Sequence, residues 1–326
     1  MYTYCSYQEA AGRIGNTPLQ RIIHIGTNGL ELFAKLEFEN AFGSIKDRVA
    51  LEMIEDAEKK GILMPYHTIV EPSSGNTAIA LANIGRLKGY KVKIIVLANI
   101  PEKKKQLIKE AGAVLELIEP EDDECCPLFP NEGAIGVARA YAESPKYKGQ
   151  YIMLNQYQNP ANPVAQRRTA EEIWRQMNGN IDIVIVPVGT GGTMAGMLRL
   201  KELNPNLKIV PVDSESKYFG MKSYKDALNF KIPRDFDAHV QRDPQNFFFH
   251  TLKSEDDGFI GAMELAEKEG ILAGLTGGAL FYVAKQFAEQ GHKGRAVFIV
   301  PDGSDRYQQE IKSFKRRMNL EERVIV

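Results

Sequence analysis

A lysine stands in a short polar segment at 43–48, which reads Gly-Ser-Ile-Lys-Asp-Arg. The segment directly precedes an amphipathic helical pattern, so Lys46 lies where a loop meets a helix start, with Ser44 and Asp47 as plausible caps. An amine shielded from water loses its proton more easily and can then bond a carbonyl cofactor as a Schiff base. An ordinary surface lysine would fit the same letters, so the segment alone leaves both interpretations open.

Two further segments place glycines and hydroxyl side chains between an apolar run and a helical pattern. Residues 71–77 read Glu-Pro-Ser-Ser-Gly-Asn-Thr, and backbone N–H groups at a helix N-terminus suit a carboxylate. Residues 188–193 read Val-Gly-Thr-Gly-Gly-Thr, and glycines there let the backbone wrap a phosphate. The glycine spacing in 188–193 matches neither the dinucleotide-binding fingerprint nor the loop that binds nucleoside triphosphates. A capped turn is the alternative for the first segment, and a turn for close helix packing is the alternative for the second.

A third glycine-rich segment, at 273–279, also opens a helical pattern, but there a packing turn is favoured over a ligand site. The five histidines are scattered without a paired nucleophile, so a Ser-His-Asp hydrolase has no visible framework. Three cysteines, two of them adjacent at 125 and 126, cannot form a disulfide framework. No zinc-ligand spacing is present, so no metal site is predicted.

The elements that must position these segments are short β-branched runs that alternate with helical patterns, which is typical of βαβ units and a mainly parallel sheet. We therefore predict an α/β fold. Its buried strands are expected at 68–70, 92–97, 114–118, 183–188, 208–212 and 296–300. Helical spacing of apolar residues is found at 49–57, 78–87 and 260–266. An acidic, proline-containing loop is expected at 119–130, and a domain boundary near 148–151.

The composition excludes several classes of protein. The chain of 326 residues has 44% hydrophobic and 25% charged side chains, as expected for a globular protein of two domains or one large α/β unit. Its net charge is −1 and its basic runs are short, so nucleic acid is not an expected partner. No stretch approaches the roughly 18 apolar residues of a membrane span, and the start lacks a signal-peptide pattern. A cytoplasmic protein without membrane partners is expected.

Taken in order, these segments resemble the cysteine synthase family of fold-type II pyridoxal-phosphate enzymes, which includes cystathionine β-synthases and synthases of diaminopropionate precursors. The resemblance covers most of the chain and becomes specific because many separate segments match in register. They lie at 15–19, 34–37, 40–48, 73–77, 155–162, 189–193, 270–274 and 301–307.

The resemblance implies roles toward the cofactor pyridoxal 5′-phosphate. Lys46 would be the catalytic lysine, which forms the internal aldimine and later moves the Cα proton. Asn76 would bond the 3′ oxygen of the cofactor, and Thr276 would face its pyridine nitrogen. A hydroxyl there leaves the ring unprotonated, a weaker electron sink that suits β-elimination. The cofactor phosphate would be held by Gly189, Thr190, Gly191, Gly192 and Thr193.

The resemblance also implies an amino-acid substrate whose carboxylate is gripped by a loop that closes on it. Such a loop and its partner would consist of Ser73, Ser74, Gly75, Asn76, Thr77 and Gln156. The implied reaction is β-replacement on O-acetylserine or O-phosphoserine through an α-aminoacrylate, with sulfide as the nucleophile. Alternatives are another β-replacement, as in cystathionine β-synthases or diaminopropionate-precursor synthases, and a cysteine-consuming lyase that releases sulfide. A catalytically silent binding homologue is the alternative from another class.

The implied architecture has two three-layer α/β domains with mainly parallel sheets, similar to the tryptophan synthase β subunit, and with the cofactor in the cleft between them. The smaller, mobile N-terminal domain would be 47–150. The larger domain would combine 1–46 with 151–326 and carry the cofactor phosphate loop. A homodimer is also implied.

Segment 214–245 departs most from the family pattern. Cysteine synthases commonly carry a glycine-rich stretch near the substrate there, whereas this chain has several cations and no such glycines. Arg234 is the preferred candidate to reach the substrate, because a guanidinium can bind a phosphate or carboxylate with two parallel bonds. A basic surface loop is the alternative, so the donor and the nucleophile stay open at this point.

Overall fold

Backbone contacts divide the chain into two units in the computed structural model, which describes residues 4–119, 133–215 and 221–320. Unit 1 contains residues 1–14 and 44–162, and unit 2 contains residues 15–43 and 163–326. The adjacent cysteines and nearly all of the predicted loop at 119–130 lie outside the described residues.

The boundaries of unit 1 differ from the 47–150 expected for the smaller domain. Strand β6 (Tyr151–Met153) pairs with β3 (Thr68–Pro72), so the chain is still in the first sheet after residue 150. Helix α1 (Tyr7–Ala11) contacts α3 (Asn76–Leu87), which adds the N-terminal residues to the same unit. The segment at 148–151, where the sequence predicts a domain boundary, therefore leads into a strand of the same sheet rather than into another sheet.

Unit 1 is built on a four-stranded, all-parallel sheet in the order β5-β4-β3-β6. Ile69 of β3 lies near Gly85 of α3, whereas the next residue, Val70, packs with Ala138. Successive strand residues point to opposite faces, so helices cover both sides of this sheet. The remaining elements are α2 (Lys46–Lys59), β4 (Lys91–Leu97), α4 (Glu102–Glu110), β5 (Val114–Ile118), α5 (Gly133–Glu143) and η3 (Pro145–Tyr147).

Unit 2 is built on a six-stranded sheet in the order β1-β2-β10-β7-β8-β9, in which β1 is antiparallel to β2 and the other pairs are parallel. Its strands are β1 (Leu19–Arg21), β2 (Leu30–Leu36), β7 (Ile183–Pro187), β8 (Lys208–Ser214), β9 (His250–Leu252) and β10 (Gly294–Val300). In the centre, β10 lies between β2 and β7, with Gly294 opposite Leu30 and Val300 opposite Leu36.

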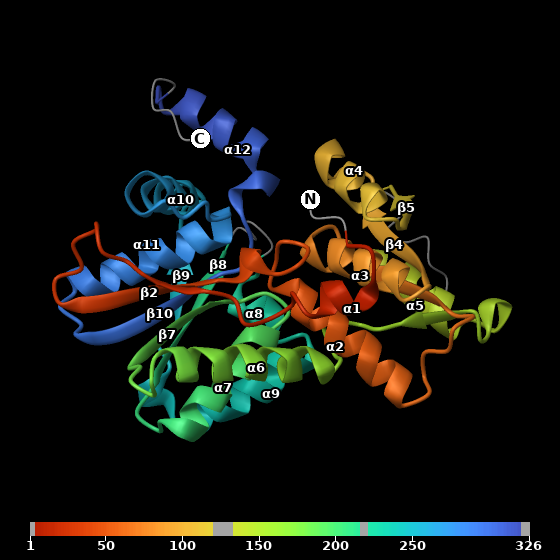
Figure 1. Cartoon of the computed structure of the whole chain (residues 1–326), viewed down its shortest axis with the longest axis horizontal. Coiled ribbons are helices and arrows are strands. Elements are labelled where there is room, and N and C mark those ends of the chain that lie inside the picture. The colour runs from red at the N-terminus through yellow and green to blue at the C-terminus, as the bar shows by residue number, and fades with distance from the viewer. Residues whose placement is uncertain (1–3, 120–132, 216–220, 321–326) are drawn as a thin grey trace. The chain divides into compact units, whose positions relative to one another are not determined.

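Helices cover both faces of the sheet of unit 2. Figure 1 shows α10 (Asp256–Glu269) and α11 (Leu275–Glu289) on one side, and α6 (Ala161–Gln176) and α7 (Gly192–Leu203) on the other. The remaining elements are η1 (Glu37–Glu39), α8 (Tyr224–Ala227), α9 (Lys231–Arg242), η5 (Pro244–Asn246), η6 (Ser304–Arg306) and α12 (Gln308–Arg317). The predicted α/β class with mainly parallel sheets is confirmed. Within the described ranges, no helix has the length and apolar character that crossing a bilayer requires.

Candidate functional site

Lys46 is the first residue of α2, and its backbone N–H donates to the hydroxyl of Ser44 at 3.3 Å. Ser44 is buried and Lys46 is partly buried. Desolvation of the amine lowers the pKa of Lys46 from 10.5 to about 8. Near that pH about half of the amines are neutral and able to bond a carbonyl carbon. This environment favours the Schiff-base interpretation over a solvated surface lysine.

The segment 73–77 joins β3 to α3, as the sequence predicts. Gly75 is the N-cap residue of α3 and provides no capping side chain, so N–H groups of the first helical turn point out of the helix. Ser74 is exposed, whereas Thr77 is buried. An exposed hydroxyl beside a helix N-terminus is suited to an anionic group such as a carboxylate.

Three hydrogen bonds hold Gln156 in place, and one of them joins it to this loop. The Thr77 hydroxyl donates to Gln156 Oε1 at 2.6 Å, and the Asn162 amide donates to the Gln156 carbonyl at 2.8 Å. The backbone N–H of Gln156 donates to Glu71 Oε1 at 2.9 Å. The structure thus brings Gln156 and the 73–77 loop together within unit 1.

Glu71, at the end of β3, is a positioning residue that sequence reasoning did not single out. Its second oxygen accepts the backbone N–H of Asn155 at 2.8 Å. Burial raises the pKa of Glu71 to about 7, against the opposing effect of these two backbone donors. The available signal was a carboxylate directly after the buried residues Ile69 and Val70.

The glycine-rich segment 189–193 lies in unit 2, between β7 and the first turn of α7. Gly191 is the N-cap residue and has a φ of +86°, in the left-handed region that favours glycine. A Cβ at this position would lie 2.6 Å from the side chain of Pro233 in α9. Gly189 and Thr190 are partly accessible, whereas Gly191, Gly192 and Thr193 are buried. The N-terminus of α7 therefore offers backbone N–H groups in the manner predicted for a phosphate.

Thr276 is a buried residue in the first turn of α11. The preceding N-cap residue, Gly274, donates its N–H to the Asp302 carbonyl at 2.8 Å. A Cβ at Gly274 would lie 2.1 Å from Asp302 Oδ1, so the turn needs glycine. Asp302 Oδ2 in turn accepts the hydroxyl of Tyr307 at 2.7 Å. These contacts fix the start of the helix that carries Thr276.

Segment 214–245 borders the phosphate-type loop within unit 2. The backbone N–H of Lys222 donates to the carbonyl of Val188 at 2.9 Å, and Pro233 packs on Gly191 as described above. Arg234 is exposed on α9, and residues 216–220 lie outside the described residues. The predicted contact of Arg234 with an anionic substrate stays a prediction.

The predicted site residues thus divide between the two units. Unit 1 holds Lys46, the 73–77 loop and Gln156, whereas unit 2 holds the 189–193 loop and Thr276. Within the described residues, no group of three or more His, Cys, Asp or Glu side chains is arranged to hold a metal ion.

Comparison with known proteins shows that the chain belongs to the family of pyridoxal-phosphate dependent enzymes, whose family model matches residues 10–302. The cysteine synthase of Aquifex aeolicus is 36% identical over 305 residues, which are 90% of this chain and 88% of that protein. The cystathionine beta-synthase of Apis mellifera is 38% identical over 90% of this chain, and the match spans 59% of its own length. A hydrogen sulfide-producing enzyme from Fusobacterium nucleatum has a solved structure that aligns with a TM-score of 0.77 and 32% identity, covering 91% of this chain and 98% of that one.

The cofactor of this family is pyridoxal 5′-phosphate, and the residues present fit it. Lys46 provides an amine whose pKa is lowered by burial. The first turn of α7 provides backbone donors where a Cβ at Gly191 would not fit, which suits a phosphate at the helix N-terminus. Thr276 provides a buried hydroxyl rather than a carboxylate for a ring nitrogen.

Proposed function

We propose that this protein catalyses β-replacement on a serine-derived amino acid, with O-acetylserine or O-phosphoserine as the donor and sulfide as the nucleophile. The observation that carries the proposal is the environment of Lys46, because burial lowers the pKa of its amine to about 8. The chain is also 36% identical to a cysteine synthase. An amine with this pKa can bond a carbonyl and can exchange a proton near neutral pH.

Each group of residues has a distinct task in this proposal. The cofactor would be held by Lys46, Asn76, Thr276 and the 189–193 loop, and its chemistry is to withdraw electrons from the Cα–H bond of the substrate. Lys46 would take the Cα proton of the substrate on its Nζ atom. The N–H groups at the start of α3 and the hydroxyl of Ser74 hold the substrate carboxylate, while Gln156 keeps Thr77 in place.

A test of this assignment is to locate the covalent link. The isolated protein is expected to absorb visible light, and borohydride reduction followed by peptide mapping is expected to place the adduct on Lys46. Lys46→Ala removes both the link and the activity. An adduct on another lysine, or a colourless protein that does not bind the cofactor, contradicts the proposal.

Cysteine consumption with release of sulfide is a second candidate, favoured by the Fusobacterium enzyme that is described as hydrogen sulfide-producing. A matrix of donors (O-acetylserine, O-phosphoserine, serine and cysteine) against nucleophiles, with product mass spectrometry, separates the two. We also propose a cytoplasmic homodimer. Sedimentation velocity tests its oligomeric state.

A further prediction follows from the separate roles proposed for the 73–77 loop, which binds the substrate, and the 189–193 loop, which binds the cofactor. Ser74→Ala is expected to weaken donor binding by about tenfold to a hundredfold, because a hydrogen bond to a charged group is worth roughly 1.5–3 kcal/mol. Cofactor affinity is expected to stay within about twofold of the wild type, since the 189–193 loop supports it separately. Titrating cofactor and donor into the same variant measures both, and equal losses of the two affinities would refute this division.

A further inference from the structure

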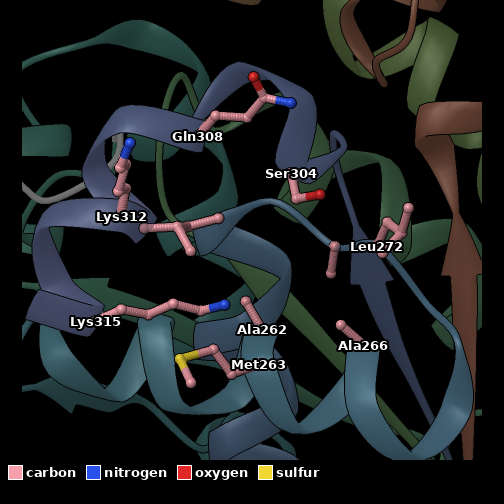
Figure 2. A pocket seen from close by; sticks show the side chains of 10 residues that line it. Ala262, Met263, Ala266, Leu272, Ser304, Gln308, Lys312 and Lys315 are labelled. Carbon is pink, nitrogen blue, oxygen red and sulfur yellow. The ribbon is translucent and has the colours of Figure 1, made fainter. Parts of the chain in front are cut away.

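A groove of about 320 Å³ lies in unit 2 between α10, α12 and the loop that follows α10. Its volume falls in the lower range of small-molecule sites. Figure 2 shows side chains of α12 and of α10 facing the same groove. The α12 residues Gln308, Ile311, Lys312 and Lys315 recur at helical spacing and so share one helix face.

The chemistry of this groove is apolar on one side and cationic on the other. Ala262, Met263 and Ala266 of α10 form the apolar side, and Leu272 adjoins them with 45% of its surface exposed. Lys312 and Lys315 provide positive charge. A ligand that matches both sides has an aliphatic body and an anionic end.

We propose that this groove is an effector site for a small molecule with an aliphatic body and one carboxylate. The body packs on α10 and Leu272, and the carboxylate pairs with Lys312 and Lys315. The residues that line the groove include none of those proposed to hold the cofactor or the substrate, so the groove is proposed as a second binding site on the same chain.

The wall of the groove is continuous with the turn that positions Thr276. Leu272 accepts the backbone N–H of Ser304 at 2.9 Å, and Ala273 forms an antiparallel bridge with Gly303. Gly274 then caps α11, whose second residue is Thr276. A ligand that packs on Leu272 acts on this turn and so on the hydroxyl at 276. This consequence for Thr276 rests on the proposed function, whereas the binding of the ligand does not.

Binding can be tested with hexanoate as the probe and 1-hexanol as its neutral counterpart. Met263 reports on the groove through its ¹³C-labelled methyl group, and Met263→Leu assigns its signal among the ten methionines. Hexanoate is expected to shift this signal saturably, and hexanol to bind at least about tenfold more weakly, as the loss of a charge-assisted contact predicts.

Three variants sharpen the test. K312M/K315M is expected to weaken hexanoate binding by about tenfold or more, whereas K103M/K109M, which removes the same charge from exposed positions on α4, leaves it unchanged. Ala266→Phe fills the groove from a partly exposed position and is expected to abolish binding. Unchanged binding in K312M/K315M or Ala266→Phe, or hexanol binding as tightly as hexanoate, overturns the proposal. Protein-concentration-dependent broadening of Met263 without ligand would place a second copy of the chain there and overturn it too.

The effector role is tested in the holoenzyme. Saturating hexanoate is expected to change the visible absorption or fluorescence of the bound cofactor in the wild type and not in Ala266→Phe. Binding without such a change overturns the effector role. A protein that binds no cofactor would instead refute the proposed function, and because the Met263 titration needs no cofactor, the two failures are distinguishable. Thermal melting of each variant verifies that it is folded.

Discussion

Glu71 illustrates how a buried side chain controls a functional loop without any part in the chemistry. Each of its carboxylate oxygens accepts one backbone N–H, from Asn155 and from Gln156. Gln156 then accepts the hydroxyl of Thr77. The geometry of the proposed carboxylate-binding loop therefore depends on the buried carboxylate of Glu71.

At about pH 5, where the raised pKa keeps Glu71 mostly neutral, Glu71→Gln is expected to destabilise the protein by about 1–3 kcal/mol. An amide has one accepting oxygen, so its NH₂ group would face a backbone donor and leave that donor buried and unpaired. Urea denaturation measures the change. Glu116→Gln is a suitable control, because Glu116 pairs with Lys93 at a partly exposed position and its replacement is expected to cost less than about 1 kcal/mol. Equal effects of the two replacements would contradict the role given to Glu71.

The residues of the proposed site differ in how far they could be predicted. Lys46, the 73–77 loop and the 189–193 loop could be predicted because glycines, hydroxyls and a lysine occur together at helix starts. Glu71 could not, because its partners lie 84 and 85 residues further along the chain. Its function depends on the pairing of β3 with β6, which no local pattern contains.

The α7 N-terminus depends on a close approach between two helices, α7 and α9. Gly191→Ala is expected to lower cofactor affinity by at least about tenfold, because its new Cβ would overlap Pro233 in addition to the cost of a left-handed backbone, which is about 1–2 kcal/mol. Gly291→Ala is the matched control: Gly291 has the same φ of +86° in the same unit, and nothing lies within 4 Å of the added Cβ. Cofactor titration of both variants separates the effect of the Cβ overlap with Pro233 from the effect of placing alanine in a left-handed backbone. Equal cofactor affinities in the two variants would contradict this account.

At the level of elements, the apolar strands could be predicted and the charged or short ones could not. In strand β2, the charged residues Glu31 and Lys35 interrupt the apolar pattern from which a buried strand could be predicted. Lys35 is nevertheless fully buried. Its amine donates to Glu172 at 2.9 Å and to the Thr17 carbonyl at 2.7 Å. The first partner lies 137 residues away, so the compensation for this buried charge is not visible in the strand itself. Strands β6 and β9, at three residues each, are too short for a periodic pattern.

The whole molecule should show a pH dependence of stability to which two buried groups of unit 1 contribute in opposite directions. Folding raises the pKa of Glu71 from 4.5 to about 7, so stability falls as the pH rises through that window. Folding lowers the pKa of Lys46 from 10.5 to about 8, so stability rises with pH between those values. The contribution of these two groups to the free energy of unfolding therefore has a minimum between about pH 7 and 8. Each group changes this free energy by on the order of 3 kcal/mol.

Urea denaturation of the cofactor-free protein at about pH 5, 7.5 and 10 checks this profile. Lys46→Met is expected to flatten the alkaline limb, and Glu71→Gln to flatten the acid limb. Lys103→Met, which replaces an exposed lysine, is expected to change neither limb. An alkaline limb that persists in Lys46→Met would contradict the burial of that amine.

The central position of β10 in its sheet sets the order in which the chain can fold during synthesis. Arg295 of β10 binds Glu31 of β2 across a separation of 264 residues, and β10 also joins β2 to β7. At about 5–20 residues per second, a ribosome needs roughly 13–50 s between making these two strands. All four strands of unit 1 are synthesised before β7, so that sheet can form while β2, which already has β1 on one side, still lacks β10 on the other. During this interval, the nascent chain carries a strand with an unpaired edge, which is the period when a chaperone would protect it most.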